Sequence, residues 1–246
     1  MKRVAPLAFI ALFAVASVAV ASADSMQTGM AHALKQYPYS DQPRLFAYKK
    51  AAEYYETFTQ YEGGNRDLRL QRGYAFLRLG DMQRELSDLQ AAMQAYQAAR
   101  LEFESLSAID PQFVEARIAV AKAWMKSGIA ELISGDIESG KQGYAKSRQL
   151  LEGIVAEYPL DGEAAEALGI VCLNQGALLS EVGPVQEASA HLEVAVRVLS
   201  ELSRTRSAPS PDLPKALMLQ AKIHELAGEY DPAVKKLLSA IRTYQE

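Results

Sequence analysis

The chain has 246 residues, a formal net charge of −4 and a single cysteine. The acidic balance disfavours nucleic acid and anionic lipid as partners, because both favour a concentrated basic face. One cysteine excludes an internal disulfide, so packing must stabilise the fold, and a chain of this length can bury enough apolar surface to do so.

The first 23 residues have the features of a secretory signal peptide. Lys2 and Arg3 precede an uncharged run from Val4 to Val20, and small residues follow it. We expect cleavage after Ala23, with Ala21 as the alternative, and a periplasmic or secreted mature protein. Removing two cations and no acid takes the net charge from −4 to −6. An uncleaved anchor is the competing interpretation, since the run approaches the roughly 17 residues that span a bilayer.

After this segment the chain is rich in Ala, Leu, Gln, Glu, Lys and Arg, which are good helix formers. Residues 41–61 are predicted to form an amino-terminal capping helix, with Leu45, Tyr48 and Tyr55 among its apolar positions. A glycine pair at Gly63 and Gly64 indicates a turn after it. We expect one all-α domain over residues 24–246, with about nine helices.

A period of 48 residues runs through the rest of the chain. It relates Gly80, Gly128 and Gly176, and it also relates Tyr96, Tyr144 and Leu192. A fixed period of this size is typical of proteins built from stacked repeats. It predicts four repeats, at about 66–110, 111–158, 161–206 and 212–246.

The last repeat has the most specific pattern. It places a small residue where two paired helices would cross, a glycine at the turn, and a small, large, small series on the second helix. The residues are Ala221, Gly228, Ala233, Leu237 and Ala240. This pattern resembles the tetratricopeptide repeat. The resemblance implies a right-handed α-solenoid of antiparallel helix hairpins, with small residues where two helix backbones approach closely.

The earlier repeats keep this pattern but are longer than the family's. The crossing positions are Gly80, Gly128 and Gly176, and the turn positions are Ser87, Gly135 and Gly183. The family period is about 34 residues, and the excess of about 14 divides into one heptad for each helix. Because seven residues turn through roughly 700°, the buried stripe stays on its face of the helix.

The resemblance also implies that the first helix of each pair lines a concave face to which partners bind. Residues on the inward positions of these helices mix apolar anchors with cations, as a peptide-binding groove does. The candidates are Tyr74, Leu77, Arg84, Lys122, Met125, Ile129, Leu173, Lys215, Met218 and Lys222.

We therefore predict an exported scaffold that binds another protein or a peptide segment through its concave face. The alternative is an accessory ligand-binding subunit of an envelope transport system, which a closed pocket would favour. Self-association through the final helix is a further interpretation, because Leu237, Leu238 and Ile241 lie on it.

No arrangement of residues indicates chemistry. Cys172 falls on an apolar helix face and is predicted to be a buried core residue. His224 falls on a packing position of the last repeat, and no nucleophile is accompanied by a base in any known pattern. We expect no enzymatic activity, no cofactor and no metal.

Overall fold

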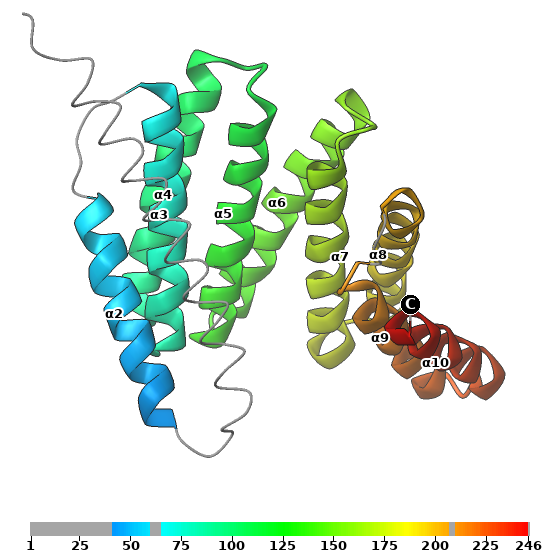
Figure 1. The fold of residues 1–246 in the computed structure, drawn as a ribbon. Coiled ribbons are helices and arrows are strands. Elements are labelled where there is room, and N and C mark those ends of the chain that lie inside the picture. Colours follow the sequence, from blue (N-terminus) through cyan, green and yellow to red (C-terminus); the bar gives the residue numbers. More distant parts are fainter. Residues whose placement is uncertain (1–40, 60–64, 207–209, 246) are drawn as a thin grey trace, which may run out of the picture. The chain divides into compact units, whose positions relative to one another are not determined.

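The computed structural model describes residues 41–59, 65–206 and 210–245, and every regular element in these ranges is an α-helix. The predicted signal peptide lies outside the described residues. Nine described helices confirm the all-α class (Figure 1), and none of them is long and apolar enough to cross a membrane. The helices are α2 (Asp41–Thr59), α3 (Arg66–Glu85), α4 (Leu89–Ile109), α5 (Val114–Ile133), α6 (Ile137–Glu157), α7 (Gly162–Val182), α8 (Val185–Thr205), α9 (Leu213–Leu226) and α10 (Tyr230–Gln245).

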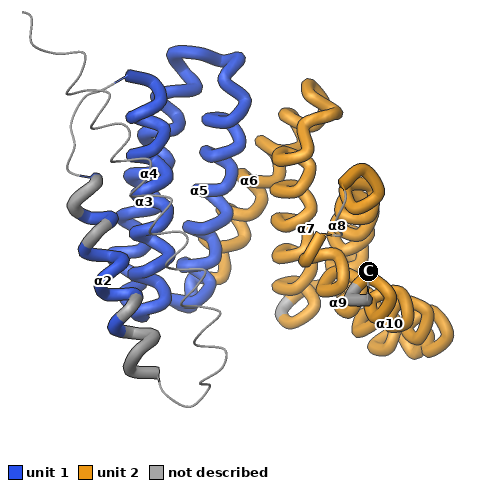
Figure 2. Tube along the Cα trace, in the orientation of Figure 1, with its two compact units in different colours: residues 1–136 blue, residues 137–246 orange. Residues whose placement is uncertain are grey.

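The helices divide between two compact units, residues 1–136 and 137–246 (Figure 2). In unit 1, α2 packs against α3, α3 against α4 and α4 against α5, and α3 also contacts α5. In unit 2, α6 to α10 pack in the same consecutive way, and α7 also contacts α9. Each unit therefore has the stacking pattern of an α-solenoid. The assignment of the whole mature chain to one domain stays a prediction.

Three helices end with the same hydrogen-bonded turn. Ser87, Gly135 and Gly228 lie in the left-handed region, with φ of 63°, 91° and 77°. Each donates its N–H to the carbonyl three residues earlier, and the following residue donates to the carbonyl five residues earlier, at 2.8 to 3.0 Å. This Schellman arrangement satisfies the last carbonyls of the helix. Three of the predicted turn positions are thus confirmed, and Ser87 carries a side chain where glycine is favoured.

The fourth predicted turn position, Gly183, has a different conformation. Its backbone is extended, with φ −133° and ψ −174°. The cause is Pro184, because the ring of a proline clashes with a preceding residue in the helical region. A Cβ atom here would lie 2.5 Å from Cδ2 of Leu179, so a larger residue would have to displace that side chain.

Two of the predicted crossing positions, Gly80 and Gly176, are sites of close approach. Gly80 of α3 faces Tyr96 of α4, and a Cβ atom on the glycine would lie 2.5 Å from Cε1 of the ring. Gly176 of α7 faces Leu192 of α8, where a Cβ atom would lie 2.5 Å from the leucine Cγ. Both large residues are 0% exposed. The repeat pattern therefore places large side chains where only glycine leaves room for them.

The added heptad carries a second copy of this contact. Seven residues before the crossing glycines stand Gly73 and Gly169, and seven residues after the large positions stand Phe103 and Leu199. Gly73 lies against the ring of Phe103, and a Cβ atom on Gly169 would lie 2.6 Å from Cδ2 of Leu199. The two helices of a pair are antiparallel. Moving seven residues back along the first helix and seven residues forward along the second therefore brings two residues face to face again.

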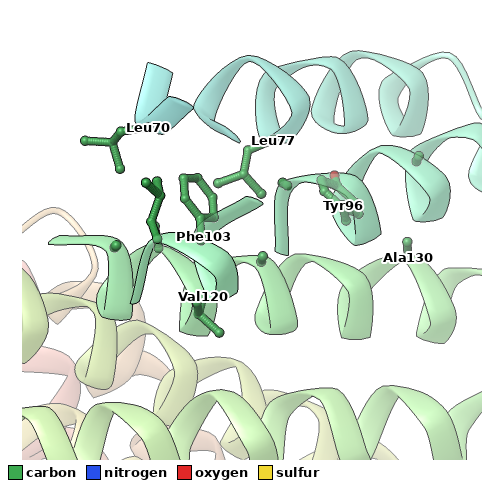
Figure 3. Packing of buried hydrophobic residues seen from close by; sticks show 12 residues of the cluster. Leu70, Leu77, Tyr96, Phe103, Val120 and Ala130 are labelled. Carbon is green, nitrogen blue, oxygen red and sulfur yellow. The ribbon is translucent and has the colours of Figure 1, made fainter. Parts of the chain in front are cut away.

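A cluster of buried apolar side chains fills the space between α3, α4 and α5 (Figure 3). Trp124 of α5 packs against this cluster from its edge, and the guanidinium of Arg100 lies over the indole at 4.3 Å. Such a stacked cation adds to the packing between α4 and α5. The labelled residues are Leu70 and Leu77 from α3, Tyr96 and Phe103 from α4, and Val120 and Ala130 from α5.

Candidate partner-binding surface

The first helices of neighbouring pairs meet directly in unit 1. We call the half-buried side chains on their common side the α3–α5 surface, which consists of Tyr74, Arg84, Lys122, Met125 and Ile129. These are five of the ten predicted candidates. Two polar bridges join the two helices beside this surface, so α3 and α5 are held together by contacts within unit 1.

The first bridge involves Tyr74. Its ring meets Phe103 edge to face, with the ring centroids 5.3 Å apart and the planes at 61°. Its hydroxyl donates to Oε1 of Glu115, on α5, at 3.3 Å. An aromatic ring with a polar tip is a common anchor in protein interfaces. Tyr74 is therefore held in place before any partner binds.

The second bridge is a nearly buried ion pair. Nζ of Lys126 donates to both carboxylate oxygens of Asp81, at 2.7 and 2.8 Å, and thereby joins α5 to α3. The side chain of Asp81 is 11% exposed and that of Lys126 is 27% exposed. The hydroxyl of Tyr96, on α4, donates to Asp81 Oδ1 at 2.9 Å. One carboxylate thus links three consecutive helices.

Burial and the Asp81 carboxylate both raise the pKa of Tyr96, while the neighbouring Arg84 guanidinium acts in the opposite direction. The phenol is therefore protonated at neutral pH and serves as a donor to Asp81. Arg84 also pairs with Glu85 at 2.8 Å. The charges around Asp81 are balanced, which allows them to be partly withdrawn from water.

Two predicted candidates lie in the interior. Leu77 is 4% exposed and belongs to the cluster between α3, α4 and α5, and Leu173 of α7 is 5% exposed. The lengthened helices explain this result, because their extra turns pack against neighbouring helices instead of facing solvent. Leu77 and Leu173 therefore contribute to packing between helices, and we leave them out of the surface.

The other three candidates lie on α9 of unit 2. Met218 is 49% exposed, and Lys215 and Lys222 are exposed. Lys215 pairs with Asp212 at 2.7 Å, in the turn before the helix. An exposed methionine between two cations is suited to an adaptable apolar contact. We refer to these three residues as the α9 surface.

Sequence reasoning missed Lys126 and Glu115, which complete the bridges to α3. A signal was present, because Asp81 and Lys126 have opposite charges on neighbouring first helices. The period places Ile129 opposite Asp81, whereas its partner lies three residues earlier, one helical turn away. A search for opposite charges with an offset of one turn would have identified the pair.

Two side chains in unit 2, Cys172 and His191, bear on the prediction that the protein has no nucleophilic chemistry. Cys172 is 0% exposed, and burial raises the pKa of its thiol to about 11, so it is protonated at neutral pH. Its predicted place in the core is confirmed. His191 lies with Nδ1 at 3.1 Å from Nη1 of Arg148, on α6, and burial lowers its pKa. Among the described residues, no three metal-binding side chains gather at one place.

These features define a class: an all-α protein of repeated helix pairs whose first helices present a mixed apolar and basic surface. Residues 48–112 match the family model for the tetratricopeptide repeat. The chain is therefore similar to the tetratricopeptide repeat family over residues 48–112, and the fold continues beyond them as further helix pairs. The tetratricopeptide repeat fold is typical of scaffolds for protein–protein interaction.

The fold is also similar to solved structures. BtubC (BKLC) from P. vanneervenii is 15% identical over 96% of this chain and 91% of that chain, with a TM-score of 0.58. The apo form of RapI is 12% identical over 86% of this chain and 67% of that chain, with a TM-score of 0.54. No curated protein matches the sequence.

Proposed function

We propose that the protein is an exported scaffold that binds segments of other proteins through the side of its first helices. The observation that supports this proposal is the α3–α5 surface, where two first helices meet and carry an anchored tyrosine beside apolar and basic side chains. Such a surface is suited to a segment that offers both apolar and acidic residues, because apolar anchors supply affinity and charge complementarity supplies specificity.

The α3–α5 surface has an anchored tyrosine and a fixed contact between its two helices in the absence of a partner. Tyr74 is fixed by Phe103 and Glu115, and the pair between Asp81 and Lys126 fixes the distance between the helices. A preformed surface avoids part of the entropy cost of ordering side chains on binding. The α9 surface offers the same combination in unit 2, with Met218 between two lysines.

Binding is tested with peptide arrays probed by the purified protein. We expect the captured peptides to combine acidic and apolar residues. Lys122→Glu and Lys222→Glu should each weaken the binding of peptides captured at their surface by at least about tenfold, which corresponds to about 1.4 kcal/mol. Lys146→Glu is the matched control, because Lys146 is exposed on a second helix, α6. Unchanged binding in both test variants would show that the first helices do not form the binding surface.

Export is tested separately by expressing the full sequence in a Gram-negative bacterium and measuring the intact mass of the protein in each fraction. We expect a periplasmic protein that begins at Asp24, after cleavage behind Ala23. A protein that retains Met1 and stays in the membrane fraction would support the anchor instead. The binding assay does not depend on this result.

The absence of enzymatic activity is part of the same proposal. It is supported by the generally non-catalytic character of tetratricopeptide-like scaffolds and by the buried, protonated state of Cys172. The accessory-subunit alternative would gain support if the array yielded no peptides and a small molecule stabilised the protein instead.

A further inference from the structure

The final helix, α10, carries an uncovered apolar stripe. Val234, Leu237, Leu238 and Ile241 are 54%, 43%, 50% and 52% exposed. At 100° per residue these positions fall within an arc of about 100°, so their side chains share one side of the helix. We call these four residues the α10 stripe. Tyr230, which is 68% exposed, continues it toward the start of the helix.

The corresponding side of α8 shows that the α10 stripe is unusual. Counting back 45 residues, the spacing between Gly176 and Ala221, the equivalent positions are Ser189, Leu192, Glu193 and Val196. Helix α8 packs against α9, and Leu192 is 0% exposed. Two of the four positions are polar in α8, although that helix has a neighbour, whereas all four are apolar in α10.

The side of a helix that faces water is expected to be polar. The α10 stripe has the opposite character, because Val234 replaces the serine and Leu238 replaces the glutamate of α8. A contiguous apolar side of this kind marks a contact surface.

The charges beside the stripe favour a second α10 helix in the antiparallel direction. Asp231 and Arg242 lie on the same flank of the stripe, near opposite ends of the helix. When two identical helices pack antiparallel, like flanks face each other, so Asp231 of each copy lies near Arg242 of the other. The opposed macrodipoles of the two helices also favour this direction.

We propose that two copies of this chain associate through the α10 stripe, with the two helices antiparallel about a twofold axis. Such an isologous contact uses the same residues on both copies and closes at a dimer. The stripe is small beside the roughly 800 Å² per partner of a standard interface, so a weak, concentration-dependent dimer is expected. This inference does not depend on the surfaces of the first helices.

The test is sedimentation velocity of the protein purified from cells that express the full sequence, over about 1 to 300 µM, where a micromolar dimer forms. The double variant Val234→Ser with Leu238→Glu gives α10 the residues of α8, which a repeat helix already tolerates. We expect it to weaken dimerisation by at least about 30-fold. Leu160→Glu is the control, because Leu160 is 99% exposed and lies in a loop.

A charge exchange tests the direction of the helices. Asp231→Arg should weaken the dimer, because it places cations near each other, and the exchange of both residues, Asp231→Arg with Arg242→Asp, should restore it. A helical circular dichroism spectrum and thermal unfolding verify that each variant folds. A monomer at every concentration, assemblies larger than a dimer, or a dimer that the α8-like variant leaves intact would each overturn the proposal.

Discussion

The two compact units build the same contact from different side chains. In unit 1, glycines of α3 face the rings of Tyr96 and Phe103, and in unit 2, glycines of α7 face Leu192 and Leu199. Both solutions bring two helices close together. They differ because Tyr96 carries a hydroxyl group into the interior. A buried hydroxyl needs a hydrogen-bond partner there.

That difference extends to the neighbouring helices. In unit 1, Asp81 accepts the hydrogen bond of Tyr96, and Lys126 balances the carboxylate. In unit 2, the position equivalent to Asp81 is Ala177, and the leucine that replaces Tyr96 needs no partner. An aromatic residue at one position of the repeat therefore requires a set of polar residues on three helices, whereas an aliphatic residue requires none.

The largest effect is expected from removing the carboxylate. Asp81→Ala leaves the Tyr96 hydroxyl and the Lys126 ammonium without their partner, and should lower the free energy of unfolding by about 3 kcal/mol. Urea unfolding followed by circular dichroism measures it, with each transition fitted separately. In a double-mutant cycle with Tyr96→Phe, the losses should overlap by about 1 kcal/mol. Additive losses would mean that the two groups act independently.

The next prediction compares a glycine that faces a rigid ring with a glycine that faces a flexible leucine. Gly80→Ala should destabilise unit 1 by about 2 kcal/mol, because the new methyl group meets a ring that Asp81 holds in place. Gly176→Ala should cost less, about 1 kcal/mol, since Leu192 has other rotamers.

Gly153→Ala is the control for both glycine variants. Gly153 lies in α6 with no atom within 4 Å of an added Cβ, and alanine there should raise stability by about 0.5 to 1 kcal/mol. Thermal unfolding of the three variants measures these changes. An equal loss at Gly80 and Gly176 would show that the side chain facing the glycine does not matter.

A smaller effect comes from exchanging residues between equivalent turns. Ser87→Gly should stabilise unit 1 by about 1 kcal/mol, because it relieves a left-handed conformation that side chains disfavour. Gly228→Ser should destabilise unit 2 by a similar amount. No atom lies within 4 Å of a Cβ at Gly228, so only the backbone conformation contributes. Changes of the same sign in both variants, measured by urea unfolding, would contradict this account.

The smallest effect is a pH dependence specific to unit 2. Burial and then Arg148 lower the pKa of His191 below its ordinary value of about 6.5, against the opposing charges of Glu187 and Glu152. The unfolded chain therefore binds a proton more readily than the folded one. Stability from this group is present above about pH 6.5 and is lost as pH falls through that value toward the folded pKa. Comparing thermal unfolding of the protein and of His191→Gln from pH 5 to 8 isolates this contribution, which should vanish in the variant.

Much of the helix pairing could be predicted because it depends on local spacing. The crossing glycines Gly80 and Gly176 follow from which residues share a helix face, and the turns at Gly135 and Gly228 follow from the preference of glycine for a left-handed backbone. The second set of close contacts was missed, although Gly73 and Gly169 keep the same period as the crossing glycines. The packing role of Leu77 and Leu173 could not be predicted, since burial depends on how neighbouring helix pairs meet.

The sequence by itself determined the period, the added heptad and the residues that face each other within a pair. These properties are fixed by the regular geometry of the α-helix, which repeats a side-chain direction over seven residues. Only the tertiary structure decided that Asp81 pairs with Lys126 one turn away from the expected position, and that the α10 stripe is uncovered. The pairing depends on the axial offset between neighbouring helices, which is set by the sizes of side chains far apart in the chain. The exposure of the stripe depends on which helices pack against α10.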